Sequence, residues 1–113
     1  MFLILFIVVS LGTSVELNCA LRNPDGSRAW WKKRDSHNIF RQFSLGTTKY
    51  GGLYTKTLTI HNLVYDDTGI YRCEGYVNGL YKKGQQIEIT VTGKLGQFVN
   101  KIQDFHRCHI NII

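Results

Sequence analysis

The sequence predicts an all-β protein, a two-sheet antiparallel β-sandwich, and three observations lead to this prediction. Apolar and polar residues alternate with period two in several segments, which is the pattern of half-buried strands. Turn-forming residues separate these segments at intervals of about ten residues, and no segment has convincing helical spacing. The chain of 113 residues is the size of one domain. Two sheets can bury their inner faces against each other, where a single sheet would leave one face bare.

The N-terminal segment allows two interpretations. Residues 1–9 read MFLILFIVV, an apolar run too short for a membrane helix, which needs about 20 residues. Small residues follow at Ser10, Gly12 and Ser14, as after the apolar region of a secretory signal peptide, although no Lys or Arg precedes the run. Residues 1–10 are therefore a signal segment, which we favour, or the first edge strand. No second run follows, so we expect no transmembrane anchor in this chain.

Residues 11–93 form the predicted domain and carry the other predicted strands. In chain order these are SVELNC at 14–19, RAWWKK at 28–33, NIFRQF at 38–43, KTLTIHNL at 56–63, IYRCEGYV at 70–77 and QQIEITVT at 85–92. Turn formers connect them at RNPDGS (22–27), VYDDTG (64–69) and NGLYKKG (78–84), where Asn-Gly is a strong hairpin signal. The periodicity stops after Gly93, so we expect residues 94–113 to form a tail outside the domain.

Strand parity places two of the three cysteines where they can meet. Cys19 and Cys73 lie 54 positions apart and both have inward parity, so in a sandwich they can face each other across the two sheets. A crosslink of this loop would stabilise the domain by about 4 kcal/mol in the chain-entropy model. We expect Trp30 to pack against this bridge, which turns Trp31 to the opposite face. Cys108, in the tail, is left over and can stay free or pair between chains.

A corner precedes the second of these cysteines. Tyr71 lies two residues before Cys73 and can bury its ring while its hydroxyl bonds a backbone group at the corner. Asp67 favours a turn there, and Gly69 relieves steric restriction.

These residues together resemble the signature of the immunoglobulin superfamily. The signature consists of Cys19, Trp30, the segment Leu58-Thr59-Ile60 and the motif Asp67-x-Gly69-x-Tyr71-x-Cys73, and the resemblance covers about residues 8–92. It implies an immunoglobulin-like sandwich, V-like or I-like, with a Cys19–Cys73 disulfide and a tyrosine corner. The segments AWWKK and TLTIHNLVYDDTGIYRCEG also look similar to the extracellular domains of lymphocyte receptors.

The chain departs from the family pattern in three places. The cysteine spacing is short for an antibody variable domain, so we expect abbreviated strands beyond residue 45. No Arg occupies the usual place to pair with Asp67, which leaves open whether Lys49 substitutes. Lys32 has inward parity after Trp30, so we expect its amine to reach the rim or the strand to end there.

The sequence offers no catalytic constellation, so we predict a protein that is not an enzyme and needs no cofactor. Neither a nucleophile elbow, a Gly-rich phosphate loop nor a metalloprotease motif occurs in it. HRCH at 106–109 offers three ligands, two His and one Cys, but one such cluster without a second ligand group does not predict a metal site. The net charge of +6 comes from scattered basic residues, and the aromatic residues do not form a nucleic-acid stacking platform.

A protein-binding surface is the better prediction, because Trp, Tyr and Arg most often anchor interfaces. The candidate partner-binding residues are Trp31, Phe40 or Phe43, Arg72, Glu74 and Tyr76 on outward parity, together with Tyr81 in the hairpin connection. The alternative is that these side chains only cover their own sheet.

We therefore predict an extracellular immunoglobulin-like recognition domain that binds another protein. The candidate roles are an immune cell-surface receptor, an adhesion receptor or an antigen-receptor-associated chain, at the cell surface within a longer product or secreted. A soluble secreted decoy or virus-encoded immunoglobulin-like binding protein is the alternative. The expected partner is a cell-surface or soluble protein, in a homo- or heterodimer, with no nucleic acid and no small-molecule substrate.

Overall fold

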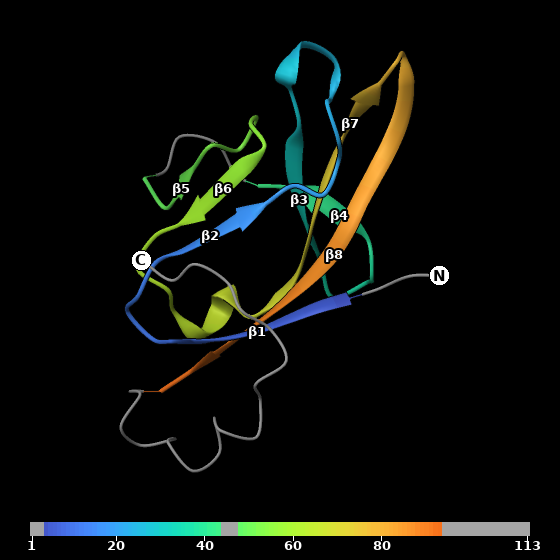
Figure 1. Ribbon diagram of the computed structural model, residues 1–113. Helices are drawn as coiled ribbons and strands as arrows, with labels where there is room; N and C mark the ends of the chain where they lie inside the picture. Colours follow the sequence, from blue (N-terminus) through green and yellow to red (C-terminus); the bar gives the residue numbers. More distant parts are fainter. Residues whose placement is uncertain (1–3, 44–47, 94–113) are drawn as a thin grey trace.

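Two β-sheets packed face to face make up the protein, as the computed structural model of residues 4–43 and 48–93 shows (Figure 1). The five-stranded sheet has the order β1 (Ile4–Ser10), β8 (Leu80–Thr92), β7 (Gly69–Val77), β3 (Trp30–Arg34) and β4 (Phe40–Gln42). The three-stranded sheet has the order β2 (Val15–Asn18), β6 (Thr57–Ile60) and β5 (Tyr50–Gly51). Two short 3-10 helices, η1 (Asp25–Ser27) and η2 (Tyr65–Asp67), complete the described elements. The predicted all-β sandwich is confirmed.

Strand β1 lies within the segment that allowed two interpretations. It forms an edge of the five-stranded sheet and runs parallel to β8, with Ile4 opposite Gln86 and Ser10 opposite Thr92. Its side chains Ile7 and Val9 are buried in the core. The described fold thus includes this segment, and cleavage of a signal peptide stays a prediction.

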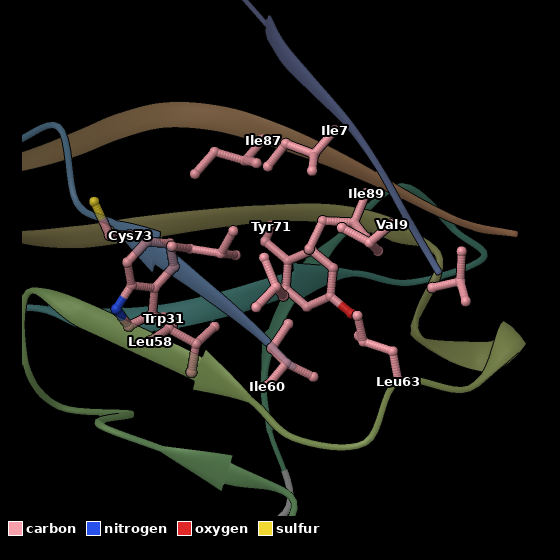
Figure 2. Close-up of a cluster of buried hydrophobic side chains, with 13 residues drawn as sticks. Ile7, Val9, Trp31, Leu58, Ile60, Leu63, Tyr71, Cys73, Ile87 and Ile89 are labelled. Carbon is pink, nitrogen blue, oxygen red and sulfur yellow. The ribbon is translucent and has the colours of Figure 1, made fainter. Parts of the chain in front are cut away.

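A disulfide between Cys19 and Cys73 joins the two sheets, with an S–S distance of 2.08 Å. Cys19 follows β2 of one sheet, and Cys73 lies in the middle of β7 of the other. The predicted disulfide is confirmed. Around it lies the apolar core, to which both sheets contribute (Figure 2). Its fully buried members include Leu17, Leu58, Ile60, Leu63, Tyr71 and Ile89.

The tryptophan of the core is Trp31, so the prediction for the two tryptophans is wrong. The β3–β7 register puts Trp31 opposite Cys73 and Trp30 opposite Glu74. Trp31 is 2% exposed, and its indole N–H donates to the carbonyl of Thr55 at 2.9 Å (Figure 2). A shift by one residue moves every side chain of a strand to the other face.

The same shift corrects the prediction for Lys32. Lys33 shares the inward parity of Trp31, and its amine reaches the rim, where it donates to the Asp66 carbonyl at 2.7 Å. Its Nζ also lies 5.5 Å from the centre of the Tyr71 ring. Desolvation by burial lowers the pKa of Lys33. Adjacent tryptophans followed by adjacent lysines therefore fit either parity.

The corner before β7 holds Tyr71 in the core. The buried Tyr71 hydroxyl donates to the Asp67 carbonyl, and burial raises the pKa of this hydroxyl. The Asp67 carboxylate accepts from the backbone N–H of Val64 at 2.8 Å and pairs with Lys49 Nζ at 2.6 Å. Lys49 thus pairs with Asp67 in this chain, which has no Arg at the usual place for that ion pair.

Strand β8 is longer than the sequence pattern predicts. It begins at Leu80 and includes the residues that we assigned to the hairpin connection. A β-bulge lies where Arg72 and Glu74 oppose Gln86 and Lys83. The expected short central strands are present as β4 and β5. The predicted tail at 94–113, with Cys108 and HRCH, lies outside the described residues.

Candidate protein-binding surface

The outer face of the five-stranded sheet, which points away from the three-stranded sheet, carries the candidate site. Because side chains alternate along a strand, every second residue of β3, β7, β8 and β4 projects onto this face. The strand register therefore brings together Trp30, Lys32 and Arg34 from β3, Phe40 and Gln42 from β4, Arg72, Glu74 and Tyr76 from β7, and Tyr81 and Lys83 from β8.

Three rings on this face form what we call the aromatic cluster, namely Trp30, Tyr76 and Tyr81. The Trp30 ring stacks with Tyr81 at 6.3 Å between centroids and lies 5.9 Å from Tyr76. The two tyrosines meet edge to face at 6.0 Å. Tyr76 is 49% and Tyr81 44% exposed, so the cluster offers ring surface to solvent.

A carboxylate lies beneath the aromatic cluster. Glu74 is 0% exposed. Its Oε1 accepts from Trp30 Nε1 at 3.1 Å and pairs with Lys32 Nζ at 2.9 Å. Its Oε2 pairs with Arg72 Nη2 at 2.6 Å, and the Tyr81 hydroxyl is a further donor. A buried carboxylate with partners of this kind fixes the position of every side chain that donates to it.

The donors also determine the charge of Glu74. Burial by itself would raise the pKa of Glu74, but hydrogen bonds from Tyr81, Lys32, Arg72 and Trp30 outweigh it and lower the pKa to about 2. Desolvation and the bond to Glu74 raise the pKa of Tyr81 to about 12. At neutral pH the carboxylate is therefore ionised and Tyr81 keeps its proton to donate.

The charge of the outer face is positive. Lys32, Arg34, Arg72 and Lys83 project onto it, against the carboxylates of Glu74 and Glu88. Glu74 offsets part of the charge of Lys32 and Arg72, and four cations against two carboxylates still leave the face positive. The guanidinium of Arg72 lies 3.8 Å from the centre of the Phe40 ring, which extends the aromatic surface toward β4.

The loop end of the site is held by Asp25 in η1. Its two carboxylate oxygens accept from the backbone N–H groups of Asn78 and Gly79, at 2.8 and 2.7 Å. Both residues of this turn have positive φ, as a two-residue hairpin loop of type I′ requires. Asp25 thus ties η1 to the tip of the β7–β8 hairpin.

The structure brings most of the predicted binding residues together, with three corrections. Tyr76, Arg72 and Phe40 lie on the outer face as predicted by parity, and Tyr81, which we placed in the hairpin connection, joins them from β8. Trp31 lies in the core and Trp30 takes its place. The Phe43 ring packs at 4.4 Å from Tyr50 and 5.9 Å from Tyr71, against the core. Glu74 has outward parity but is covered by its donors, so it supports the surface from below.

Sequence reasoning missed Lys32 and Asp25 as parts of the site. The parity error for Trp30 removed Lys32 from the outer face. Asp25 lies in the turn signal PDG, but nothing local indicates that its carboxylate reaches a hairpin 53 residues later.

Neither a cluster of metal ligands nor a membrane-spanning helix occurs in the part of the chain that the structure describes. Within residues 4–43 and 48–93, no three His, Cys, Asp or Glu side chains group as metal ligands. The same residues include no helix long and apolar enough to cross a membrane.

Comparisons with known proteins agree with this fold. The family model for the immunoglobulin domain matches residues 6–80. Among solved structures, the chain is similar to the tandem Ig repeats of Dlar, with a TM-score of 0.63 and 18% identity over 80% of this chain and 45% of that chain. It is also similar to the N-terminal four Ig domains of Dscam1 isoform 6.9, with a TM-score of 0.65 and 23% identity over 80% of this chain and 23% of that chain. The chain thus spans less than half of each. No curated protein matches it.

Proposed function

Because this chain belongs to the immunoglobulin domain family, we propose that it is an extracellular recognition domain whose outer face binds another protein. The observation that carries the proposal is the half-exposed aromatic cluster held in place over the buried carboxylate of Glu74. Trp, Tyr and Arg are the residues on which binding energy concentrates in protein interfaces.

The rigidity of this surface supports the proposal. A side chain that must be ordered on binding costs about 0.5–1.5 kcal/mol of affinity. Trp30, Lys32 and Arg72 are already held by Glu74, so little of this cost remains when a partner arrives. Tyr76 and Tyr81 pack on Trp30 and remain about half exposed, which suits an interface with an aromatic centre.

The location and the kind of receptor belong to the same proposal. A disulfide such as Cys19–Cys73 persists in oxidising compartments, which favours an extracellular place. The resemblance of AWWKK and of the corner segment to lymphocyte receptors favours an immune cell-surface receptor, an adhesion chain or an antigen-receptor-associated chain. A soluble decoy is the alternative. A longer transcript with a membrane segment would support the receptor, and an intact protein in the medium would support the decoy.

A binding screen tests the proposal. The biotinylated chain, tetramerised on streptavidin to gain avidity, is applied to an array of purified cell-surface ectodomains. Each interaction found is then measured with Tyr76→Ala, Tyr81→Ala and the matched control Tyr65→Ala. Tyr65 is 59% exposed and lies in η2, at the other end of β7.

We expect the variants of the aromatic cluster to weaken binding by about tenfold or more, the range of an interface hot spot. The control should bind as the parent chain does. Tyr65→Ala and Tyr76→Ala should keep the melting temperature of the parent, whereas Tyr81→Ala also removes a donor to Glu74 and should lower it. Unchanged binding by both cluster variants, or an equal loss in the control, would contradict the proposed face.

A further inference from the structure

A hollow of about 580 Å³, the end pocket, opens where β3 begins and the β7–β8 hairpin turns. Its lining residues are Asp25, Arg28, Ala29, Trp30, Tyr54 and Tyr76. The volume lies in the range of pockets that hold small molecules or a large side chain. Because Trp30 and Tyr76 belong to both, the end pocket continues the aromatic cluster at its loop end.

Three aromatic side chains line the end pocket. Trp30 and Tyr76 come from neighbouring strands of the sheet, and Tyr54, which is 53% exposed, comes from the connection between β5 and β6. That connection is fixed to β3, because the backbone N–H of Trp31 donates to the Leu53 carbonyl at 3.1 Å. The pocket therefore offers ring faces for another ring or for an aliphatic chain.

The two charged groups of the end pocket, Asp25 and Arg28, differ in whether they already have partners within the chain. Both oxygens of Asp25 already accept from the amides of the hairpin tip. The exposed guanidinium of Arg28 makes no ion pair or side-chain hydrogen bond with any residue in 4–43 or 48–93. The charged group of the pocket that is left without a partner among the described residues is thus the Arg28 cation, and the basic outer face beside it has the same sign.

We propose that the end pocket takes an aromatic side chain of the partner protein, with a neighbouring carboxylate of that partner paired to Arg28. The partner segment is therefore acidic and aromatic. This inference rests on the proposed function and specifies the chemistry of the partner. A second copy of this chain fits less well, since each copy carries a net charge of +6 and a basic outer face.

Three small probes that share one ring test the pocket without the partner. Indole-3-acetate carries a negative charge, indole-3-acetamide none, and tryptamine a positive one. Each is titrated into the disulfide-bonded, isotope-labelled chain, and amide shifts are followed by NMR. The variant is Arg28→Gln. The matched control is Arg22→Gln. Arg22 is exposed, lies in the same β2–β3 connection as Arg28 and does not line the pocket.

We expect indole-3-acetate to shift the amides of Ala29, Trp30 and Tyr76. It should bind about two- to fivefold tighter than the amide, which is the range for one exposed ion pair. Arg28→Gln should remove this difference and leave the affinity for the amide unchanged, while Arg22→Gln keeps the difference. Added salt should reduce the difference in affinity between indole-3-acetate and indole-3-acetamide, because an exposed ion pair is screened.

Three results would overturn the proposal. One is tighter binding of tryptamine, which would make Asp25 the recognition group. Another is the absence of localised shifts from any probe at millimolar concentration. The third is sedimentation showing that the chain associates with itself in a way that Arg28→Gln abolishes, which would put a second copy in the pocket. If the probes behave as expected and Arg28→Gln weakens partner binding while Tyr81→Ala, which lies outside the pocket, leaves it intact, the outer-face proposal fails and the pocket proposal stands.

Discussion

Replacement of Glu74 by Gln is the sharpest test of how the outer face is built. The substitution keeps the size and shape of the side chain but removes its charge. It leaves the cations of Lys32 and Arg72, now beside a neutral amide, without their counterion. It also replaces one of the two acceptor oxygens by an NH₂ group, which only donates hydrogen bonds. The side chains that donated to this oxygen therefore lose their acceptor.

The loss in the free energy of unfolding caused by Glu74→Gln follows from the pKa shift of Glu74. The pKa of Glu74 falls from its ordinary 4.5 to about 2, and each unit is worth about 1.36 kcal/mol. The shift therefore corresponds to about 3 kcal/mol at most. The side chains of Lys32 and Arg72 are 25% and 13% exposed, so water screens part of this interaction. We expect Glu74→Gln to lower the free energy of unfolding by about 2 kcal/mol at pH 7.

The pH dependence identifies the cause of that loss. The folded-state pKa of Glu74 lies below the unfolded value, so the stability it contributes is present above 4.5 and disappears as the pH falls toward 2. The variant lacks this contribution at every pH. Urea denaturation of both proteins, followed by tryptophan fluorescence, should therefore give a difference in unfolding free energy that is constant from pH 7 to about pH 5 and shrinks as the pH falls from 4.5 toward 2. A difference that does not shrink below pH 4.5, or one near zero at pH 7, would refute the reasoning.

Three further substitutions test the core, the bulge and the loop end. Trp31→Ala should lower the free energy of unfolding by about 3–5 kcal/mol in urea denaturation, as for other buried aromatics, and a loss below 1 kcal/mol would contradict its core position. Gly84→Ala should cost about 1–3 kcal/mol and lower the melting temperature, because its Cβ would lie 2.5 Å from the sulfur and 3.1 Å from the carbonyl oxygen of Cys73. Asp25→Ala should speed hydrogen exchange at the amides of Asn78 and Gly79 with little change in global stability. Unaltered exchange at these amides would contradict the role of Asp25 in holding the hairpin tip.

The sequence predicts those parts of the fold whose signals are local. The corner before β7 is one such part, because Asp67, Gly69 and Tyr71 are close in the chain and their roles need no knowledge of other strands. The alternation Leu58-Thr59-Ile60 is another, since only one parity puts apolar residues inward. In both places the structure buries the apolar residues that the pattern places inward, since Leu58, Ile60 and Tyr71 are all 0% exposed.

The parity of β3 shows where local signals fail. Two adjacent tryptophans and two adjacent lysines satisfy the alternation equally well in either register. The choice is made by partners far along the chain, since Trp30 meets Glu74 and Trp31 meets Cys73 and the Thr55 carbonyl. The burial of Glu74 could not be predicted from the sequence for the same reason. A glutamate on outward parity indicates solvent exposure, unless one knows that two cations and an indole converge on it.

Strand β7 couples the stability of the domain to the outer face for which we propose a binding role. Its residue 73 is crosslinked to the other sheet, and the next residue carries the carboxylate on which the outer face is assembled. The strand has neighbours on both sides, so its backbone is among the least free to move in the sheet. Inward substitutions should therefore change stability and leave the chemistry of the face alone, and exposed outward ones should do the reverse. Glu74 is the exception, because it is buried and lies on the outward side. A loss at Glu74 should thus reduce both stability and partner binding, whereas Tyr76 should affect binding alone.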